Sequence, residues 1–490
     1  MSDGKRMNFV IFMPDEMRAD ATGCYGHPLV QTPNLDALAA SGTRFDQCYI
    51  QHPVCSPSRC SMMTGWYPHV AGHRTLWHLL RPHEPNLLKY LKQTGYDVRW
   101  YGKNDLLAPG SFATSVTEAL KPAARRTSHR LAAGPEDPLY DSFLNGPIPG
   151  GPWDTGDGAS VAKGLEFLRS PHDRPFMLYL PLSHPHPPYT SPPPWYDMYA
   201  PRDVPALRPP DLPGRPSFHR LIRQTRRLDH LDEQAFRRIA AVYLGMISYS
   251  DFLLGELLKV LDQTGLAENT CVIFTADHGD WAGEFGLVEK WASALDDTIA
   301  RVPLVIRCPG AKAGHVVDSP VELFDIMPTV LELADLEARH THFARSLRPQ
   351  LGGLPGQADR AAFAEGGYDV HEPHCFEGRQ GPTWPSRDPS FIYYQKGLLQ
   401  QTHPHSTCRT VMIRTACHKL VYRTADACEL YDMRADPQET NNLYGKGQVA
   451  KLQQELELQL LHFYTRTCDV TPWDEDPRGL PPGGFTDSAC

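Results

Sequence analysis

Short apolar runs rich in β-branched and aromatic residues alternate with segments of helical periodicity through most of the chain. The runs cover residues 9–13, 98–101, 176–180, 272–275 and 304–307, and the clearest helical segments cover 34–40, 86–94 and 236–261. Thr32-Pro33 is a good helix start and Gly95 a good helix stop. Because alternating strands and helices are typical of a parallel sheet covered by helices, this part of the chain predicts an α/β fold.

Two proline-containing stretches, residues 109–153 and 181–216, show no usable period and predict long surface loops. Loops around the carboxyl edge of a sheet commonly wall a substrate site. The second stretch carries aromatic residues that either contact a ring or sugar of the substrate or pack the loop down, namely Tyr189, Trp195, Tyr196 and Tyr199.

The pattern changes after about residue 362. Residues 391–394 and 409–422 are β-rich, and residues 449–465 have helical periodicity. A chain of 490 residues exceeds the size at which one core usually keeps growing. We therefore expect a large mainly parallel sheet sandwiched by helices in residues 1–362, and a smaller C-terminal α+β domain with an extended tail in residues 363–490.

Composition and charge narrow the classes of function. Hydrophobic residues make up 41% and charged residues 21% of the chain, as in globular proteins. The formal net charge of -9 gives no general basic field, so nucleic acid is not an expected partner. An anionic ligand would need a local cationic site.

The N-terminus has no recognisable export signal, and no apolar stretch approaches the roughly eighteen residues of a membrane span. We therefore expect a cytoplasmic protein without a membrane partner. The twelve cysteines include no C-x-x-C pair, which fits reduced thiols and argues against a structural zinc site.

Acidic residues follow two of the predicted strands. Asp15 and Glu16 come just after residues 9–13, and Asp277-His278 follows residues 272–275. A single acid at a strand end is most often a helix cap. Two strand ends that carry carboxylates and an imidazole together favour a site for one divalent cation.

Cys55 lies at a predicted helix start, because Ser56-Pro57 follows it and Arg59 comes about one turn later. A helix N-terminus with a nearby arginine predicts an anion site with a reactive group in it. The alternative is a buried structural cysteine, which is the commonest fate of an unpaired thiol.

The segment Cys55-Ser56-Pro57-Ser58-Arg59 resembles the C-x-P-x-R signature of the sulfatase family, within the alkaline phosphatase superfamily. The resemblance continues in chain order over nearly the whole chain. It includes residues 95–103, 185–188, 277–279, 286–290, 429–432, 436–439 and 442–443. It implies the alkaline phosphatase/sulfatase-like α/β fold and a cysteine that is oxidised to formylglycine after translation.

Carried over residue by residue, the resemblance implies one divalent ion, with Ca²⁺ expected and Mn²⁺ or Mg²⁺ as alternatives. Its ligands would be Asp15, Asp277, His278 and the modified Cys55. Arg59 would stabilise the formylglycine hydrate, Lys103 and Lys290 would contact the anion, and His186 would assist the leaving oxygen. The implied partners are a small anionic ester as substrate and a formylglycine-generating enzyme during maturation.

The chain departs from the family pattern at three positions. Many sulfatases have two adjacent aspartates where this chain has Asp15-Glu16, so Glu16 is either a fifth ligand or points away. Asp105 stands where many have a histidine, and an acid beside a substrate anion is repulsive unless it is protonated, cation-bound or engaged with a positive part of the substrate. Asp277-His278, in place of Asp-Asn, is similar to the phosphonate monoester hydrolases.

Other histidines are weaker candidates. His78 is expected either to contact substrate or to be a satisfied structural histidine, and His184 could exchange roles with His186. His371, His374, His403 and His405 have no metal spacing and are interpreted as surface or pocket-rim residues.

The leading functional hypothesis is hydrolysis of sulfate monoesters. The nearest alternative is a phosphonate monoester hydrolase or phosphodiesterase with the same machinery, and a third hypothesis is a non-catalytic anion-binding protein in which Cys55 stays a thiol. We also expect a homo-oligomer, although the sequence specifies no interface. The Pro- and Gly-rich tail, residues 471–490, either reaches a neighbouring subunit or is disordered.

Overall fold

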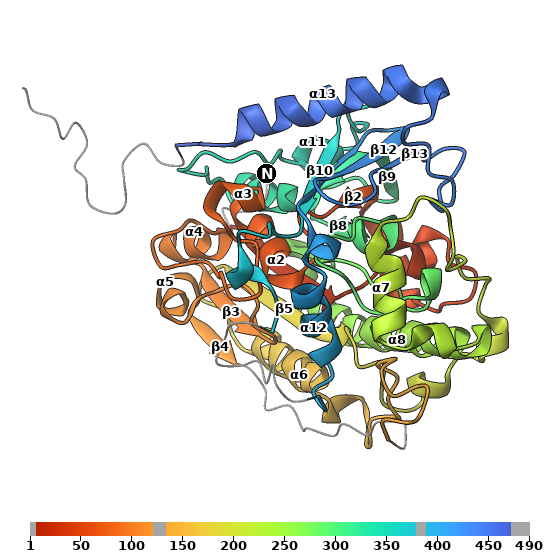
Figure 1. Ribbon diagram of the computed structural model, residues 1–490. Coiled ribbons are helices and arrows are strands. Elements are labelled where there is room, and N and C mark those ends of the chain that lie inside the picture. Colours follow the sequence, from red (N-terminus) through yellow and green to blue (C-terminus); the bar gives the residue numbers. More distant parts are fainter. Residues whose placement is uncertain (1–5, 121–133, 379–388, 472–490) are drawn as a thin grey trace, which may run out of the picture.

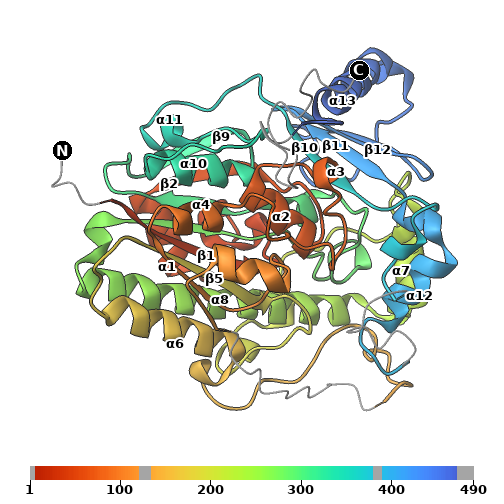
Figure 2. The ribbon, with the colours of Figure 1, turned by 90° about the vertical axis from the view of Figure 1, so that its left-hand side faces the viewer.

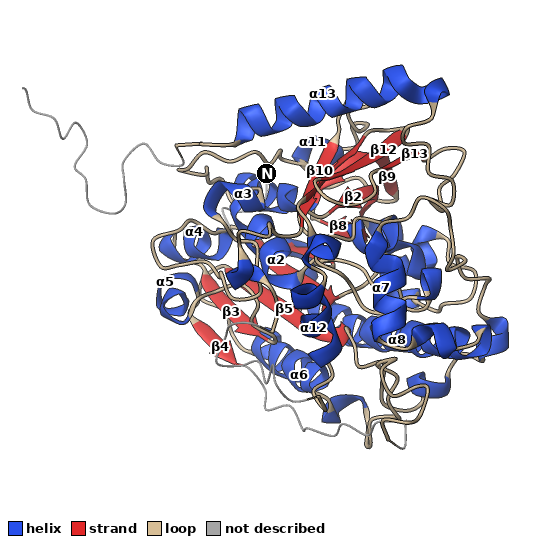
Figure 3. Cartoon of the chain, in the orientation of Figure 1, coloured by secondary structure: helices blue, strands red, loops and turns tan. Residues whose placement is uncertain are grey.

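The computed structural model describes residues 6–120, 134–378 and 389–471, in which a large α/β unit lies beside a smaller sheet (Figure 1). The predicted tail lies outside the described residues from residue 472 on. Figure 3 distinguishes the strands of the two sheets from the helices that pack on them.

The large sheet has nine strands in the order β4-β3-β5-β1-β6-β8-β2-β7, with β9 beside β2. Its strands are β1 (Asn8–Asp15), β2 (Thr43–Tyr49), β3 (Asp97–Tyr101), β4 (Glu118–Leu120), β5 (Phe176–Pro185), β6 (Thr270–Thr275), β7 (Arg301–Val302), β8 (Leu304–Arg307) and β9 (His315–Glu322). The central strands β3, β5, β1 and β6 all run parallel, whereas β7 and β8 pair antiparallel with β2. The predicted mainly parallel sheet is confirmed.

Helices cover both faces of this sheet, which is why β1 is buried at every position instead of alternating. One face carries α6 (Gly156–Arg169) and α8 (Glu233–Gln263), and the other carries α2 (Cys55–Thr64), α4 (Leu87–Gln93) and α10 (Ile326–Leu333) (Figure 2). α1 (Pro33–Ser41) packs on α8. The remaining helices of the large unit are α3 (Pro68–Ala71), α5 (Phe112–Ser115), α7 (Ser217–Thr225), α9 (Asp297–Ala300) and α11 (Arg348–Leu351).

The smaller sheet is antiparallel and is covered by the long C-terminal helix. Its order is β10 (Ala362–Gly366), β11 (Thr410–Arg414), β12 (His418–Arg423) and β13 (Glu429–Asp432), and α13 (Ala450–Thr467) packs on β11 and β12. β10 begins at the last residue of the predicted first domain. The division into two domains at that point stays a prediction.

Of the two β-rich runs predicted in the C-terminal part, the first is wrong and the second is confirmed. Residues 391–394 do not form a strand, because the aromatic run ends in the first turn of α12 (Tyr394–Thr402), where helix-forming residues follow it. Residues 409–422 form the two strands of a hairpin, β11 and β12, because the chain turns between Thr415 and His418.

The two stretches that were predicted to be surface loops are partly buried and contain regular secondary structure. The first contains α5 and β4, and its Phe143 and Leu144 are each 2% exposed. β5 extends into the second as far as Pro185. Large apolar side chains therefore fix both stretches to the core.

α8 is the one helix in the described ranges that is long and apolar enough to cross a membrane by length and composition. The expectation that no stretch reaches that length is wrong here. However, 83% of its most apolar window is buried inside the protein, against the sheet and α6. The apolarity of α8 is that of a core helix.

Candidate active site

Four neighbouring parallel strands bring most of the predicted site residues to one edge of the large sheet. In spatial order they are β3, β5, β1 and β6. Lys103 follows β3, His186 follows β5, Asp15 ends β1, and Asp277 follows β6. Because ligands bind at the carboxyl ends of parallel strands, the topology itself places these side chains where a ligand can reach them.

Asp15, Cys55, Asp277 and His278 form a buried cluster in which one potential ligand atom of each lies within 4.8 Å of the others. His278 Nδ1 donates to the carbonyl of Gly279 at 2.9 Å, so the neutral ring leaves Nε2 unprotonated. Burial keeps the pKa of His278 below its ordinary value, which favours that neutral form. Two carboxylates and an imidazole held in this tautomer by a backbone carbonyl fit a divalent cation.

Cys55 is the first residue of α2, and its Sγ lies 3.2 Å from His278 Nε2, 3.6 Å from Asp15 Oδ1 and 3.9 Å from Lys103 Nζ. Burial and the charge of Asp15 raise the pKa of the thiol well above its ordinary value, although two lysines act in the opposite direction. The helix start therefore does not make an unmodified Cys55 into a reactive thiolate.

Arg59 is fully buried between the two acidic ligand candidates. Its Nη2 donates to Asp15 Oδ2 and its Nε to Asp277 Oδ2, both at 2.8 Å. Burial raises the pKa of Asp15, but Lys103 and Arg59 lower it well below its ordinary value, so this carboxylate is ionised. Arg59 Nη1 has no hydrogen-bond partner among the described residues.

Lys103 joins the cluster to Asp105. Its Nζ lies 2.6 Å from Asp15 Oδ2 and 2.8 Å from Asp105 Oδ2. An acid beside a substrate anion was expected to be protonated, bound to a cation or engaged with a positive part of the substrate. In the structure Asp105 is bound to a cation, the ammonium group of Lys103. Asp105 is therefore not an unpaired negative charge at the site.

Glu16 is turned toward Lys290, whose Nζ donates to Glu16 Oε2 at 2.7 Å. With Asp15 and His186 it forms a second group of potential metal ligands, in which His186 Nε2 lies 3.5 Å from Glu16 Oε2. Glu16 Oε1 is buried and has no hydrogen-bond partner in the described part of the chain. Burial raises the pKa of Glu16 well above its ordinary value, and Lys290 only partly offsets this.

The two loop histidines lie in different surroundings. His186 Nδ1 donates to the carbonyl of Pro187 at 2.6 Å, and the ring is close to Glu16. His184 Nδ1 instead lies 2.6 Å from Asp157 Oδ2 at the start of α6, and its ring packs edge-on against Tyr249. His184 thus contacts α6 and α8, which cover one face of the large sheet, and not the cluster around Asp15.

His78 is half-buried, and its Nδ1 lies 2.8 Å from the hydroxyl of Thr75. Its ring makes an edge contact with His374, with the centroids 6.5 Å apart. The four C-terminal histidines of the sequence analysis are all exposed: His371, His374, His403 and His405.

The tyrosines of the second proline-rich stretch pack inward. Tyr189, Tyr196 and Tyr199 are at most 6% exposed. Tyr189 donates to Asp280 Oδ1, and Tyr199 donates to or accepts from the hydroxyl of Ser248. Of the two interpretations of these three side chains, packing of the loop is the one that the structure bears out.

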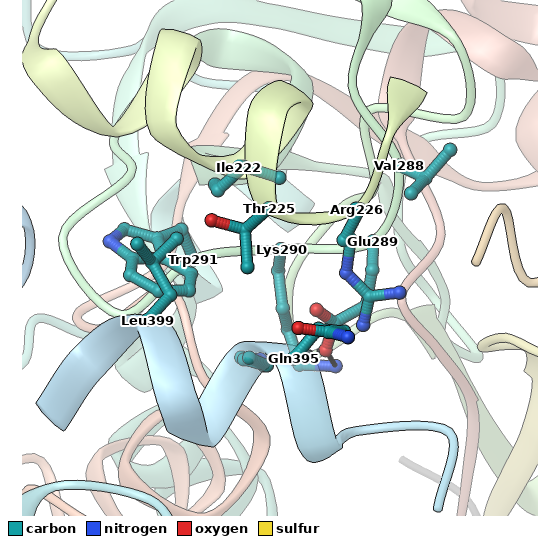
Figure 4. Close-up of a pocket in the computed structure, with 10 residues that line it drawn as sticks. Ile222, Thr225, Arg226, Val288, Glu289, Lys290, Trp291, Gln395 and Leu399 are labelled. Atoms are coloured by element: carbon teal, nitrogen blue, oxygen red, sulfur yellow. Dashed lines mark hydrogen bonds and ion pairs between the residues drawn. The ribbon is translucent and has the colours of Figure 1, made fainter. Parts of the chain in front are cut away.

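The sequence alone did not reveal a buried group of charged side chains behind Lys290, formed by Glu289 and Lys396 (Figure 4). Glu289 Oε1 lies 3.3 Å from Lys290 Nζ and 2.7 Å from the Nζ of Lys396, which belongs to α12. These residues line a cavity of about 10 Å³ between α7, α12 and the segment around Lys290. A single lysine in a helix of the C-terminal part carries no motif, so no signal in the sequence connected Lys396 with the site.

These residues and this fold are those of a known enzyme class. The Sulfatase family model matches residues 7–336, and the model described as N-sulphoglucosamine sulphohydrolase, C-terminal, matches residues 375–466. The chain belongs to the sulfatase family and is a sulfuric ester hydrolase.

Individual relatives match along almost the whole chain. The sulfatase YidJ of Escherichia coli is 27% identical over 98% of this chain and 93% of its own length. The N-acetylglucosamine-6-O-sulfatase of Bacteroides thetaiotaomicron is 26% identical over 93% of this chain and 86% of its own length. Among solved structures, the phosphonate monoester hydrolase of Agrobacterium radiobacter has a TM-score of 0.76 at 22% identity, covering 94% of this chain and 96% of its own. That likeness supports the fold.

Proposed function

We propose that the protein cleaves the S–O bond of sulfate monoesters with a formylglycine formed from Cys55 and one divalent ion. The observation that carries the proposal is the convergence of Cys55 with Asp15, Asp277 and His278, within 4.8 Å, at the carboxyl edge of the sheet. The family supports the reaction, since its members generally use this modified residue and a divalent ion.

Asp15, Asp277, His278 and residue 55 would hold the ion. Two carboxylates favour a hard cation, and we propose Ca²⁺, with Mn²⁺ or Mg²⁺ as alternatives. When bound, the ion would lower the pKa of the attacking hydroxyl of hydrated formylglycine and orient the sulfate.

Positively charged side chains of the protein would bind the sulfate group and stabilise the transition state. Lys103 and Lys290 would bind the sulfate oxygens, and their positions are set before substrate arrives by Asp15 and Glu16. Preorganised charges in a buried site stabilise the developing charge of the transition state better than water does. Arg59 would hold the modified residue 55 through its unpartnered Nη1.

His186 would deliver a proton to the leaving oxygen. Its Nδ1 proton is committed to Pro187, so Nε2 is the atom that exchanges protons. Burial, Lys290 and Lys103 keep the pKa of His186 well below its ordinary value. A bound sulfate ester adds negative charge beside the ring, which would raise that pKa toward the range useful for a general acid.

Cys55→Ala and Cys55→Ser test the nucleophile. Both side chains are smaller than or similar to cysteine, so the fold should persist, but neither gives an aldehyde in a cell that modifies only cysteine. We expect both variants to lose hydrolysis of an aryl sulfate while retaining the thermal midpoint (Tm) of the wild type. Wild-type turnover by Cys55→Ala would refute the role of residue 55.

A second candidate function uses the same residues on phosphonate monoesters or phosphodiesters. The Asp277-His278 pair and the fold likeness to a phosphonate monoester hydrolase favour considering it. Values of kcat/KM on an aryl sulfate, an aryl phosphonate monoester and a phosphodiester with the same leaving group would rank the two. A higher kcat/KM for either phosphorus ester would reverse our choice.

A further inference from the structure

Lys290 lies between two buried carboxylates. Its Nζ is 2.7 Å from Glu16 Oε2 and 3.3 Å from Glu289 Oε1, and the three side chains are at most 4% exposed. Because both carboxylates are out of water, each attracts the ammonium group strongly. The position of Lys290 therefore depends on how much of the charge of Glu289 is already compensated.

Lys396 supplies that compensation. Its Nζ is 2.7 Å from Glu289 Oε1, closer than Lys290, and its side chain is 3% exposed. On the other side it lies 3.7 Å from Glu377 Oε1, and Gln400 of the same helix donates to that oxygen at 3.1 Å. Carboxyl groups and lysines thus alternate in a row from the end of β1 to α12, in the order Glu16, Lys290, Glu289, Lys396 and Glu377.

The backbone of Glu289 is held in place, so its main chain does not move when one of its lysine partners is removed. Its φ is 63°, in the left-handed region that costs free energy for a residue with a side chain. Its N–H donates to the hydroxyl of Tyr189 at 2.9 Å and to Asp280 Oδ1 at 3.1 Å. With Glu289 fixed, loss of Lys396 would leave Lys290, at 3.3 Å, and the nearby Arg226 as the cations beside it.

We propose that Lys396 is a positioning residue, which neutralises Glu289 and so leaves Lys290 beside Glu16 and directed at the sulfate group. The inference rests on the proposed function, because it assigns Lys290 to substrate binding. Through Lys396 the C-terminal part of the chain would influence the active site, although Lys396 itself would not contact the substrate.

The test compares Lys396→Met and Lys396→Arg with Lys419→Met as a matched control. Lys419 is a fully buried lysine of the same C-terminal part, paired with Asp297 at 2.9 Å and Glu439 at 2.6 Å, and the proposed mechanism does not use it. The readouts are the dissociation constant (Kd) of inorganic sulfate by calorimetry, kcat and KM on an aryl sulfate, and Tm.

We expect Lys396→Met to weaken sulfate binding and to raise KM by about tenfold each, because a buried ion pair next to Lys290 is broken. Lys396→Arg should recover most of both. Lys419→Met should lower Tm by a similar amount and leave Kd and KM within about threefold of wild type. A Kd and KM for Lys396→Met as little changed as those of Lys419→Met would overturn the inference.

Removing the charge of Glu289 gives a sharper check. In Glu289→Gln the carboxylate that competes with Glu16 for Lys290 is gone, so adding Lys396→Met should change the Kd of sulfate by less than about twofold. A further tenfold loss in the double variant would show that Lys396 acts otherwise. Because sulfate binding needs no turnover, absence of sulfatase activity in the wild type would refute the proposed function separately.

Discussion

Arg59 and a divalent ion would share the same two carboxylates. In the structure Asp15 and Asp277 each accept a hydrogen bond from Arg59 and each belong to the group of potential metal ligands. A carboxylate has two oxygens and about four lone-pair directions, so it can accept from a guanidinium and bind a cation together. At the scale of residues, Arg59 fixes the orientation of both acids, which would position them for the proposed ion.

Asp15→Ala and Asp277→Ala should each abolish the bound divalent ion and the sulfatase activity, since each removes a carboxylate ligand and leaves Arg59 with an unpaired buried charge. Metal analysis of the purified variants measures this. Asp157→Asn is the matched control, because Asp157 is 4% exposed but binds the amides of Ser183 and His184. Wild-type metal content in both alanine variants would refute the site.

His186→Asn and His184→Asn should separate the two loop histidines. Loss of a general acid typically costs about 10²–10⁴ in rate, so His186→Asn should lower kcat most on esters with poor leaving groups. His184→Asn should leave kcat within a few-fold of wild type and lower Tm, because it loses the contact with Asp157. Equal losses on good and poor leaving groups for His186→Asn would contradict the assigned proton transfer.

At the scale of elements, α8 holds the start of α1 through one carboxylate. Asp251 accepts hydrogen bonds from the backbone N–H of Asn34 at 3.2 Å and of Leu35 at 2.7 Å, so it caps the neighbouring helix in place of a residue of that helix. Burial raises the pKa of Asp251 to about 6, despite these hydrogen bonds.

The pKa of Asp251 predicts a specific pH dependence. A raised carboxyl pKa means that the folded state binds more protons than the unfolded state between about pH 4 and pH 6, so this group's contribution to stability falls as pH rises through that window. Asp251→Asn removes the titration. The Tm of Asp251→Asn relative to wild type should therefore rise from pH 4 to pH 6 and stay constant above; a constant difference throughout would contradict the shift.

The sequence located the elements whose patterns are local. Central strands and long helices were predicted to within a few residues because apolar runs, helix starts and stops mark them. Residues 391–394 were misassigned, since an aromatic run has the same composition in a strand and in a packed turn before a helix. β2 and β9 pair at a distance in sequence and alternate too weakly to be recognised.

At the scale of the whole molecule, the site residues near strand ends were predictable because parallel topology collects strand ends at one edge. Asp15, Lys103, His186 and Asp277 meet for that reason. The contact of Lys396 with Glu289 behind the site was not predictable, because it depends on where α12 packs. That packing is a tertiary result with no local signature.

The large unit and the smaller sheet should unfold together. Buried ion pairs join them, including Lys419 with Asp297 and Arg215 with both Asp296 and Glu429. Separating the units would leave these charges unpaired, which is costly. We expect loss of helical signal and loss of activity to coincide in urea; a first transition that abolishes activity while most helical signal remains would contradict a shared transition.

The central claim is that Cys55 becomes the nucleophile, and the mass of the tryptic peptide Phe45–Arg59 tests it most directly. Conversion of the thiol-bearing carbon of Cys55 to an aldehyde lowers this mass, and fragmentation assigns the change to residue 55 and not to Cys48. In active protein made together with a formylglycine-generating enzyme, we predict the lowered mass at Cys55. An unshifted peptide in protein that hydrolyses sulfate esters would contradict the account.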